Sequence, residues 1–153
     1  MRRIVRTRFR PGTKFVASAL SLLVLLSASS CHWLRYHDLV RTHVDLMERI
    51  AMDVGDAVDS GKYRLRPADL QTMAYPLERA HAFLDETEGR RDSTASRMRL
   101  EEFVEAYQEL YEYLDRVRTI SSDDKRAKKV DALIAEVTRR AQATRSALDE
   151  ETG

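Results

Sequence analysis

His43 and Met47 are the first pair of residues whose types and spacing could do chemistry. His43 falls near the centre of an apolar stripe, between Val40 and Met47. Because residues four apart lie on one face of a helix, this pair can present an imidazole and a thioether together to copper or haem iron. The alternative is a histidine in or beside the core that makes one hydrogen bond. The chain has one cysteine, so haem attached through a Cys-x-x-Cys-His motif is excluded.

Glu78 and His81 have the Glu-x-x-His spacing that di-iron helical bundles use. Such a site needs a second copy of the motif and two further inward acids, whereas Glu136 is followed at the equivalent position by Arg139. Glu78 also falls about 120° from the centre of its apolar stripe, so we expect it to face solvent. His81 and Asp85 are four apart and form either half of a surface zinc site or an ordinary helical pair. We expect no complete metal site.

The sequence gives little support for nucleophilic catalysis or for a glycine-rich phosphate-binding loop. The serines fall in capping or loop contexts, and none sits in a glycine-flanked nucleophile elbow. With five glycines in the chain, no glycine-rich phosphate loop is available. We therefore expect no catalytic residues and no enzymatic activity.

The first 30 residues have the three parts of a secretory leader. Residues 1–14 carry six basic side chains and no acid, which keeps this end on the cytoplasmic side of a membrane. Residues 15–26 are almost wholly apolar, a run shorter than the roughly 20 residues that span a membrane comfortably. Small residues then precede Cys31, which is the expected arrangement around a peptidase cleavage site.

The string Ala28-Ser29-Ser30-Cys31 resembles the lipobox of bacterial lipoproteins. The resemblance covers the leader and Cys31 only, and Ala28 departs from the commoner leucine at the first position. It implies cleavage before Cys31 and covalent attachment of diacylglycerol and an N-acyl chain such as palmitate, with no other cofactor. Ordinary secretory cleavage after Ser30, leaving a soluble protein, and an uncleaved anchor are the alternatives.

Charge changes sign once the leader is removed. The leader holds six of the 26 basic residues and none of the 25 acidic ones, so residues 31–153 carry 20 basic and 25 acidic side chains, a formal net charge of −5. This excess of acids argues against a nucleic-acid partner, because phosphate binding needs clustered cations. Residues 31–153 match one ordinary domain, held together by packing because no second cysteine is present.

Four helical segments are predicted after Cys31, because apolar residues recur at three- and four-residue steps. The first covers about residues 33–60 and ends at Gly61, a C-terminal cap. The second begins at Pro67 and ends at Gly89. Because Pro76 lies inside it, a kink is expected near Tyr75 within one continuous helix. The third covers about residues 96–120, and a fourth follows a capping box at Ser121 and Asp124. No strand alternation is visible in residues 31–153.

The predicted fold class is therefore all-α. Short connections make consecutive helices antiparallel neighbours, so the simplest architecture for residues 31–153 is an up-down-up-down four-helix bundle. A long helical hairpin or a coiled-coil dimer is the alternative, since the segments are long and rich in charge.

The junction between anchor and bundle leaves little slack, because the helical pattern begins directly after Cys31. Trp33, Arg35 and Tyr36 suit a membrane interface, so we expect the bundle to stand against the bilayer. If the resemblance to lipoproteins holds, His32 in place of aspartate after the cysteine implies sorting to the outer membrane. The expected location is then the cell envelope, lipid-anchored and facing the periplasm.

The third helical segment carries the candidate partner surface. Glu101, Glu105, Glu109 and Glu112 follow one side of it, which is either a solvated face or a surface for a basic partner. Tyr107 and Tyr111 have the phase of core residues. Tyr113 lies about 100° from the centre of the stripe, is expected to be exposed, and is a candidate partner anchor.

Together these features predict a lipid-anchored, non-enzymatic adaptor, assembly factor or structural subunit that binds another envelope protein. The alternative is a ligand-, metal- or haem-binding sensory bundle that uses His43 and Met47.

Overall fold

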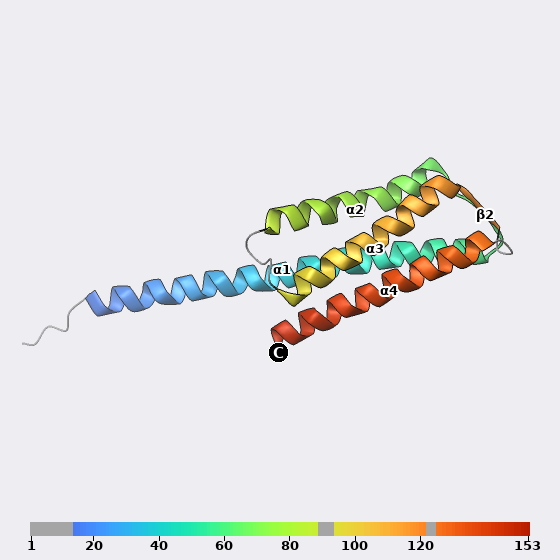
Figure 1. The fold of residues 1–153 in the computed structure, drawn as a ribbon. Helices are drawn as coiled ribbons and strands as arrows, with labels where there is room; N and C mark the ends of the chain where they lie inside the picture. The colour runs from blue at the N-terminus through green and yellow to red at the C-terminus, as the bar shows by residue number, and fades with distance from the viewer. Residues whose placement is uncertain (1–13, 89–93, 122–124) are drawn as a thin grey trace, which may run out of the picture. The chain divides into compact units, whose positions relative to one another are not determined.

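The structure is a computed structural model that describes the backbone of residues 14–88, 94–121 and 125–153, with the side chains of residues 35–61, 64–88, 94–120 and 125–153. The chain divides into two compact units, Met1–Tyr36 and His37–Gly153. Its elements, labelled in Figure 1, are α1 (Lys14–Asp59), β1 (Lys62–Arg64), α2 (Pro67–Thr87), α3 (Ala95–Val117), β2 (Thr119–Ser121) and α4 (Lys125–Thr152). The second unit is an all-α bundle in which four helices pack against one another.

The sequence predicted most of the helix ends well, but the first helix begins at Lys14 and not near residue 33. α1 ends at Asp59, just before Gly61, whose φ of 138° is open to glycine but strained for other residues. α2 begins at Pro67, and the Asp69 carboxylate accepts a hydrogen bond from the Arg66 backbone N–H at 2.8 Å. α2 also continues through Pro76 as one helix. The expected capping box at Ser121 and Asp124 lies outside the described side chains.

Two expectations at the end of the third helix are wrong. α3 ends at Val117 and not near Ile120, because Arg118 adopts a left-handed conformation with φ 56° and its N–H bonds to the Leu114 carbonyl at 3.0 Å. The chain then forms β2, which pairs antiparallel with β1 so that Arg64 lies opposite Thr119. The prediction that residues 31–153 contain no strand is therefore wrong. Strands of three residues are too short to show an alternating pattern.

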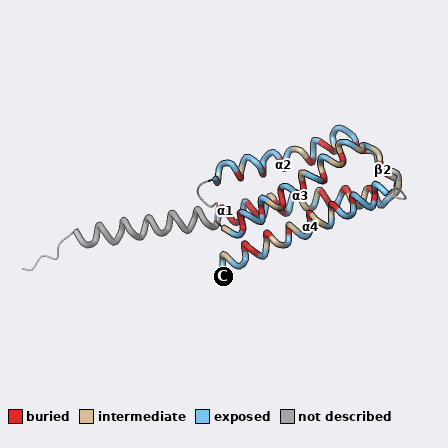
Figure 2. Tube along the Cα trace, in the orientation of Figure 1, coloured by how far each residue is buried: buried red, intermediate tan, exposed pale blue. Residues whose placement is uncertain are grey.

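The core lies between the helices, where the predicted stripes meet. Figure 2 shows the buried positions recurring along each helix of the second unit. The largest side chains with almost no exposure are Tyr107, Phe103, Met47, Met73, Leu100, Leu110, Leu114, Ile120 and Leu148. The deep burial of Tyr107 raises the pKa of its hydroxyl well above the ordinary value.

Named contacts tie each helix to two neighbours. Arg41 of α1 pairs with Asp149 of α4 at 2.5 Å, and the Thr144 hydroxyl of α4 donates to the Arg99 carbonyl of α3 at 3.0 Å. The two remaining seams are made by Arg97 of α3, which donates to the Leu84 carbonyl of α2 at 2.9 Å, and by His43 of α1, whose ring centroid lies 5.4 Å from that of Phe83 of α2. The four helices thus enclose one core.

Removing a core side chain from α3 tests this packing. Leu110 is fully buried, so Leu110→Ala is expected to lower the free energy of unfolding by about 2–5 kcal/mol through lost transfer energy and the cavity left behind. Leu46, which is 44% exposed on α1, is the matched control, and Leu46→Ala should change stability by no more than about 0.5 kcal/mol. Urea denaturation followed by circular dichroism measures both. Equal losses would contradict the assignment of Leu110 to the core.

Candidate functional site

Two adjoining hollows form a continuous acidic groove along α1 and α4. The first has a volume of about 420 Å³ and is lined by Asp45, Glu48, Arg49, Met52, Asp53, Asp56 and Arg145. The second has a volume of about 340 Å³ and is lined by Met52, Gly55, Asp56, Asp59, Asp131, Ile134 and Ala135. Met52 and Asp56 line both hollows. These residues are called the acidic groove below.

The groove arises from the second stripe of α1. Asp45, Glu48, Met52, Asp56 and Asp59 recur at three- and four-residue steps, so they share one side of the helix, next to its buried stripe. At Gly55 and Ile134, which both line the second hollow, α1 and α4 approach closely. A Cβ built on Gly55 would lie 2.9 Å from Ile134 Cδ1, so the absence of a side chain at Gly55 permits this approach.

One arginine neutralises only one end of the groove. Arg145 of α4 donates to Asp45 Oδ1 at 2.7 Å and also bonds to Glu48, and these carboxylates raise the pKa of its guanidinium, with the bond to Glu48 contributing most. Asp53, Asp56, Asp59 and Asp131 make no ion pair with any residue that the structure describes. Arg49 also lines the first hollow without an ion pair among the described residues, so carboxylates outnumber cations along the groove and several have no paired cation in the described part of the chain.

Met52 adds an apolar contact to the groove. Its side chain is 53% exposed and lies among the carboxylates of both hollows. Thioethers are flexible and adapt to varied apolar partners, which is why methionine is common at binding surfaces. The arrangement suits a basic segment that also carries an apolar side chain.

The acidic row predicted on α3 is present, but its charge is partly satisfied. Glu101, Glu105, Glu109 and Glu112 are all exposed, as a solvated face requires. Glu109 lies 3.5 Å from Lys129 Nζ, Glu112 accepts a hydrogen bond from Gln108 at 2.8 Å, and Glu101 pairs with Arg97 at 3.2 Å. Of the predicted row, Glu105 has no ion pair among the described residues.

Two tyrosines of α3 differ from expectation. Tyr111, predicted in the core, and Tyr113, predicted to be exposed, are both half-buried, whereas Tyr107 is fully buried as expected. The buried stripe of α3 is too narrow to include Tyr111 fully. Tyr113 lies outside the stripe, but neighbouring side chains cover part of it. A partner anchor at Tyr113, with Glu105, Glu109 and Glu112 beside it, remains a prediction.

His43 is half-buried beside Phe83, and Met47 is fully buried in the core. Burial lowers the pKa of His43, and the Arg79 charge lowers it further. The imidazole is therefore neutral at neutral pH and retains a lone pair. Binding of a metal or haem by His43 and Met47 remains a prediction.

The other metal candidates lie on the surface. Glu78 is exposed, as its phase predicted, and so are His81 and Asp85. His81 Nε2 lies 3.2 Å from Gln108 Oε1 of α3, so a hydrogen bond across two helices engages it. Among the side chains that the structure describes, no group of three or more His, Cys, Asp or Glu residues could hold a metal ion.

The N-terminal site residues fall at the edge of the described region. The side chains of Cys31 and Trp33 lie outside the described residues, Arg35 is exposed, and Tyr36 is 4% exposed. Lipid attachment at Cys31 and a membrane interface at Trp33, Arg35 and Tyr36 remain predictions. Within the described region, no helix is both long and apolar enough to cross a membrane.

Sequence reasoning missed a buried polar cluster at the start of α3. Glu151 of α4 accepts hydrogen bonds from the Ser96 backbone N–H at 2.8 Å and the Ser96 hydroxyl at 2.7 Å, and its other contact is His37 Nε2 at 3.4 Å. A carboxylate at a helix N-terminus also interacts favourably with the helix dipole. This cluster fastens α1, α3 and α4 together. Its contacts join residues distant in sequence, so no local signal could have found it.

No protein-family model matches this chain, and the comparisons with curated proteins and with solved structures likewise found no match.

The lowered pKa of His43 predicts a loss of stability in mild acid. Above pH 6.5, the ordinary value, His43 is neutral in both states and its contribution is fully present. As the pH falls through and below 6.5, the unfolded chain takes up a proton that the folded chain resists, so stability is lost. His43→Leu should reduce the difference between the free energies of unfolding at about pH 8 and about pH 5.5, measured with urea on the full chain in detergent micelles. If His43→Leu leaves the difference between the two free energies of unfolding unchanged, the lowered pKa of His43 is contradicted.

Proposed function

We propose that this chain is a lipid-anchored protein of the cell envelope, without enzymatic activity, that binds another envelope protein through the acidic groove. The observation that carries the proposal is the set of uncompensated carboxylates, Asp53, Asp56, Asp59 and Asp131, arranged around the exposed Met52. An excess of charged groups of one sign beside an exposed apolar side chain is typical of surfaces that select a partner of the opposite charge.

The chemistry of the groove favours a protein partner over a small molecule. The two hollows are open and follow the length of two helices, and Met52 offers an apolar contact between charged walls. A basic segment of a partner would place Lys or Arg beside the free carboxylates and an apolar side chain on Met52. Arg145 already satisfies Asp45 and Glu48, so the partner's cations would bind toward Asp56 and Asp59.

The anchor follows from the leader and from Cys31. The proposal is cleavage before Cys31, acylation of its thiol and amine, and an outer-membrane location facing the periplasm. Trp33 and Arg35 would then lie near the headgroups, whereas the burial of Tyr36 leaves its ring little surface to offer to lipid. The anchor confines the bundle to the membrane surface, which raises its effective concentration toward partners in the same membrane.

We further propose an up-down-up-down order for the four helices. Contacts between neighbouring helices support it, because residue numbers rise along one helix as they fall along the next. On α1 and α4, Arg41 pairs with Asp149 and Asp45 pairs with Arg145. On α3 and α4 the same trend runs through Ser96 with Glu151, Glu102 with Arg140, and Glu109 with Lys129. These contacts within one chain favour the bundle over a coiled-coil dimer.

A ligand-binding bundle is the second candidate. The neutral, half-buried imidazole of His43 favours it, because a metal or haem iron binds the unprotonated ring. A titration of the full chain with copper or haem decides this case. Binding that is lost in His43→Ala would support a ligand-binding function. The absence of binding to the unaltered chain would contradict that function.

Site-specific photocrosslinking in cells tests the groove. A photoreactive amino acid at Met52 should yield one discrete crosslinked product, whereas the same probe at Tyr75, which is 64% exposed on α2, should yield none. Replacing Asp53 and Asp56 by Asn should strongly reduce the Met52 product by removing two carboxylates. The charge-matched control, Glu105→Gln with Glu109→Gln, should not. Equal crosslinking at Met52 and Tyr75 would contradict binding in the groove. Crosslinking at Met52 that is unaffected by the two Asn substitutions would contradict it as well. The acidic row of α3 would then be the candidate partner surface.

Cys31→Ser tests the anchor. The unaltered protein should incorporate labelled palmitate and fractionate with membranes, whereas Cys31→Ser should incorporate none because the acceptor thiol is gone. Mass spectrometry of the mature N-terminus should find the diacylated cysteine. A free, unmodified Cys31 at the mature N-terminus would instead establish ordinary secretion.

Close docking to the bilayer is tested by inserting a ten-residue Gly/Ser linker after Cys31. The insertion should weaken the Met52 crosslink if the short junction positions the bundle. An unchanged crosslink yield would contradict the need for close docking while leaving the anchor and the groove intact.

A further inference from the structure

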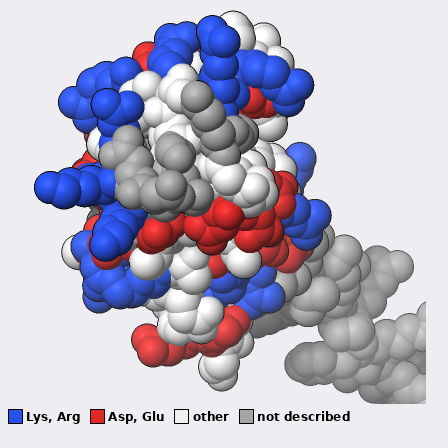
Figure 3. Space-filling view, turned by 90° about the vertical axis from the view of Figure 1, so that its right-hand side faces the viewer, with Lys and Arg blue, Asp and Glu red and all other residues white. Residues whose placement is uncertain are grey.

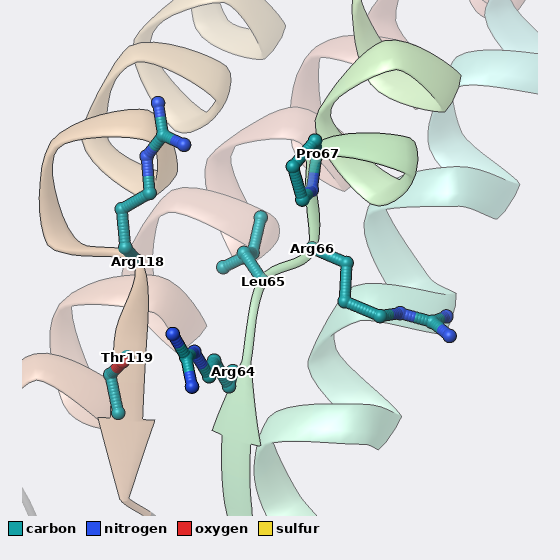
Figure 4. A pocket seen from close by; sticks show the side chains of 6 residues that line it. All are labelled: Arg64, Leu65, Arg66, Pro67, Arg118 and Thr119. Carbon is teal, nitrogen blue, oxygen red and sulfur yellow. The ribbon is translucent and has the colours of Figure 1, made fainter.

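A second pocket, with chemistry opposite to that of the acidic groove, lies where β1 leads into α2 and α3 leads into β2 (Figure 4). Its volume is about 690 Å³. Its lining consists of Arg64, Leu65, Arg66, Pro67, Arg118 and Thr119. Three of these six residues are arginines and none is acidic. This set is called the arginine pocket below.

The backbone beneath the arginine pocket is fixed by several contacts. Arg64 and Thr119 are paired across the two strands, and the Leu65 N–H donates to the Arg118 carbonyl at 2.9 Å. The Leu65 side chain is buried, which anchors this segment to the core. Arg118 keeps its left-handed backbone in this setting. The pocket therefore has a rigid floor, and a ligand would not have to order the chain.

The three guanidinium groups are not equally engaged. Arg66 is paired with Asp69 at 3.0 Å, and Arg118 donates from Nε to the Asp115 carbonyl at 2.8 Å and is paired with the Asp115 carboxylate. The guanidinium of Arg64 makes no hydrogen bond or ion pair among the described residues. In Figure 4 the Arg64 side chain lies over the strands beside Thr119, whereas Arg66 extends away from it. Within the described part of the chain, Arg64 is thus the arginine of the pocket whose guanidinium is available to a ligand.

Donors remain for a ligand even on the engaged arginine. A guanidinium has five N–H groups, and Arg118 uses only Nε and one terminal nitrogen on Asp115. Arg64 retains all five, and the Thr119 hydroxyl makes no hydrogen bond with any described residue. These donors belong to residues that line one hollow, and several donors match an anion with several oxygens better than a single carboxylate.

Cations gather on this end of the bundle although residues 31–153 carry a formal charge of −5. Figure 3 looks onto this end, and Lys and Arg side chains cluster over its upper part, where α2 begins and α3 ends. Arg126 of α4 also reaches this region, donating to the Thr119 carbonyl at 3.4 Å. The attraction for an anion is therefore local to this patch.

We propose that the arginine pocket binds a phosphate group, with Arg64 as the principal ligand and Arg118 and Thr119 as supporting donors. Planar guanidinium groups bind phosphate oxygens through paired N–H bonds, and the pocket volume leaves room for an organic group against the exposed Pro67. The phosphate belongs either to a free phosphate compound or to a lipid headgroup. The inference is independent of the acidic groove and of the anchor at Cys31.

The test is a titration of the isotope-labelled full chain in neutral detergent micelles with inorganic phosphate at constant ionic strength. Saturable shifts of the Leu65 and Thr119 amide signals are expected. Arg64→Ala should weaken binding about tenfold or more, because charge-assisted bonds to Arg64 are lost. Arg64→Lys, which keeps the charge but not the fork of donors, should recover part of the affinity. A parallel arm replaces phosphate with vesicles of phosphatidylglycerol.

The matched control is Arg79→Ala, which removes one exposed arginine of α2 outside the pocket and should leave the affinity unchanged. Binding of phosphate in solution assigns a free phosphate compound, and binding of vesicles alone, with the same dependence on Arg64, assigns a lipid headgroup. Two results would overturn the proposal. One is no saturable binding in either arm, and the other is equal weakening by Arg64→Ala and Arg79→Ala, which would indicate attraction to surface charge only.

Discussion

Coverage of the apolar stripe of each helix by its neighbours is the constraint on which the rest of this structure depends. The chain has a single cysteine, so no disulfide within the chain can hold residues 31–153 together. Each stripe is buried only if the other three helices are in place, as the burial of Met47, Met73, Phe103 and Val137 on four different helices illustrates. Cooperative packing of this kind makes the bundle stable as a unit and weak in its parts.

Apolar stripes alone would leave the helices free to slide, and directional contacts remove that freedom. Arg97 is 6% exposed and bonds to the Leu84 carbonyl and the Thr87 hydroxyl at 2.9 Å and 2.6 Å, which sets the register of α2 on α3. Glu151 does the same for α4 on α3 through Ser96. At the other end, the pairing of β1 with β2 joins the two helix connections. Hydrogen bonds are selective for position where hydrophobic contacts are not.

The helices could be predicted from the sequence, because apolar periodicity and end signals such as Pro67 and Gly61 act within a few residues. The sequence was insufficient for β1 and β2, which are too short to alternate, and for Arg97 and His37, whose burial depends on partners from other helices. The acidic groove could be predicted from the sequence only in part. Its stripe from Asp45 to Asp59 is visible in the sequence, but the hollow itself depends on the approach of Gly55 to Ile134, which no local pattern encodes.

The electrostatic potential of the acidic groove and of the arginine pocket depends on the charges that have no ion-pair partner nearby. The net charge of the chain describes neither surface. Many arginines are neutralised within one helical turn, as Arg139 is by Glu136 and Arg99 is by Glu102. Such exposed pairs contribute only about 0.3–0.5 kcal/mol each to stability, but they remove their charges from the field that a partner meets. The charges that have no partner among the described residues are separated in space. Carboxylates of this kind line the groove of α1, and Arg64 lies on the strand that follows. Because salt screens exposed charges beyond about 8–10 Å, a bound partner responds to the charges it touches. One bundle with a small net charge can therefore offer two separate surfaces, one to a cation and one to an anion.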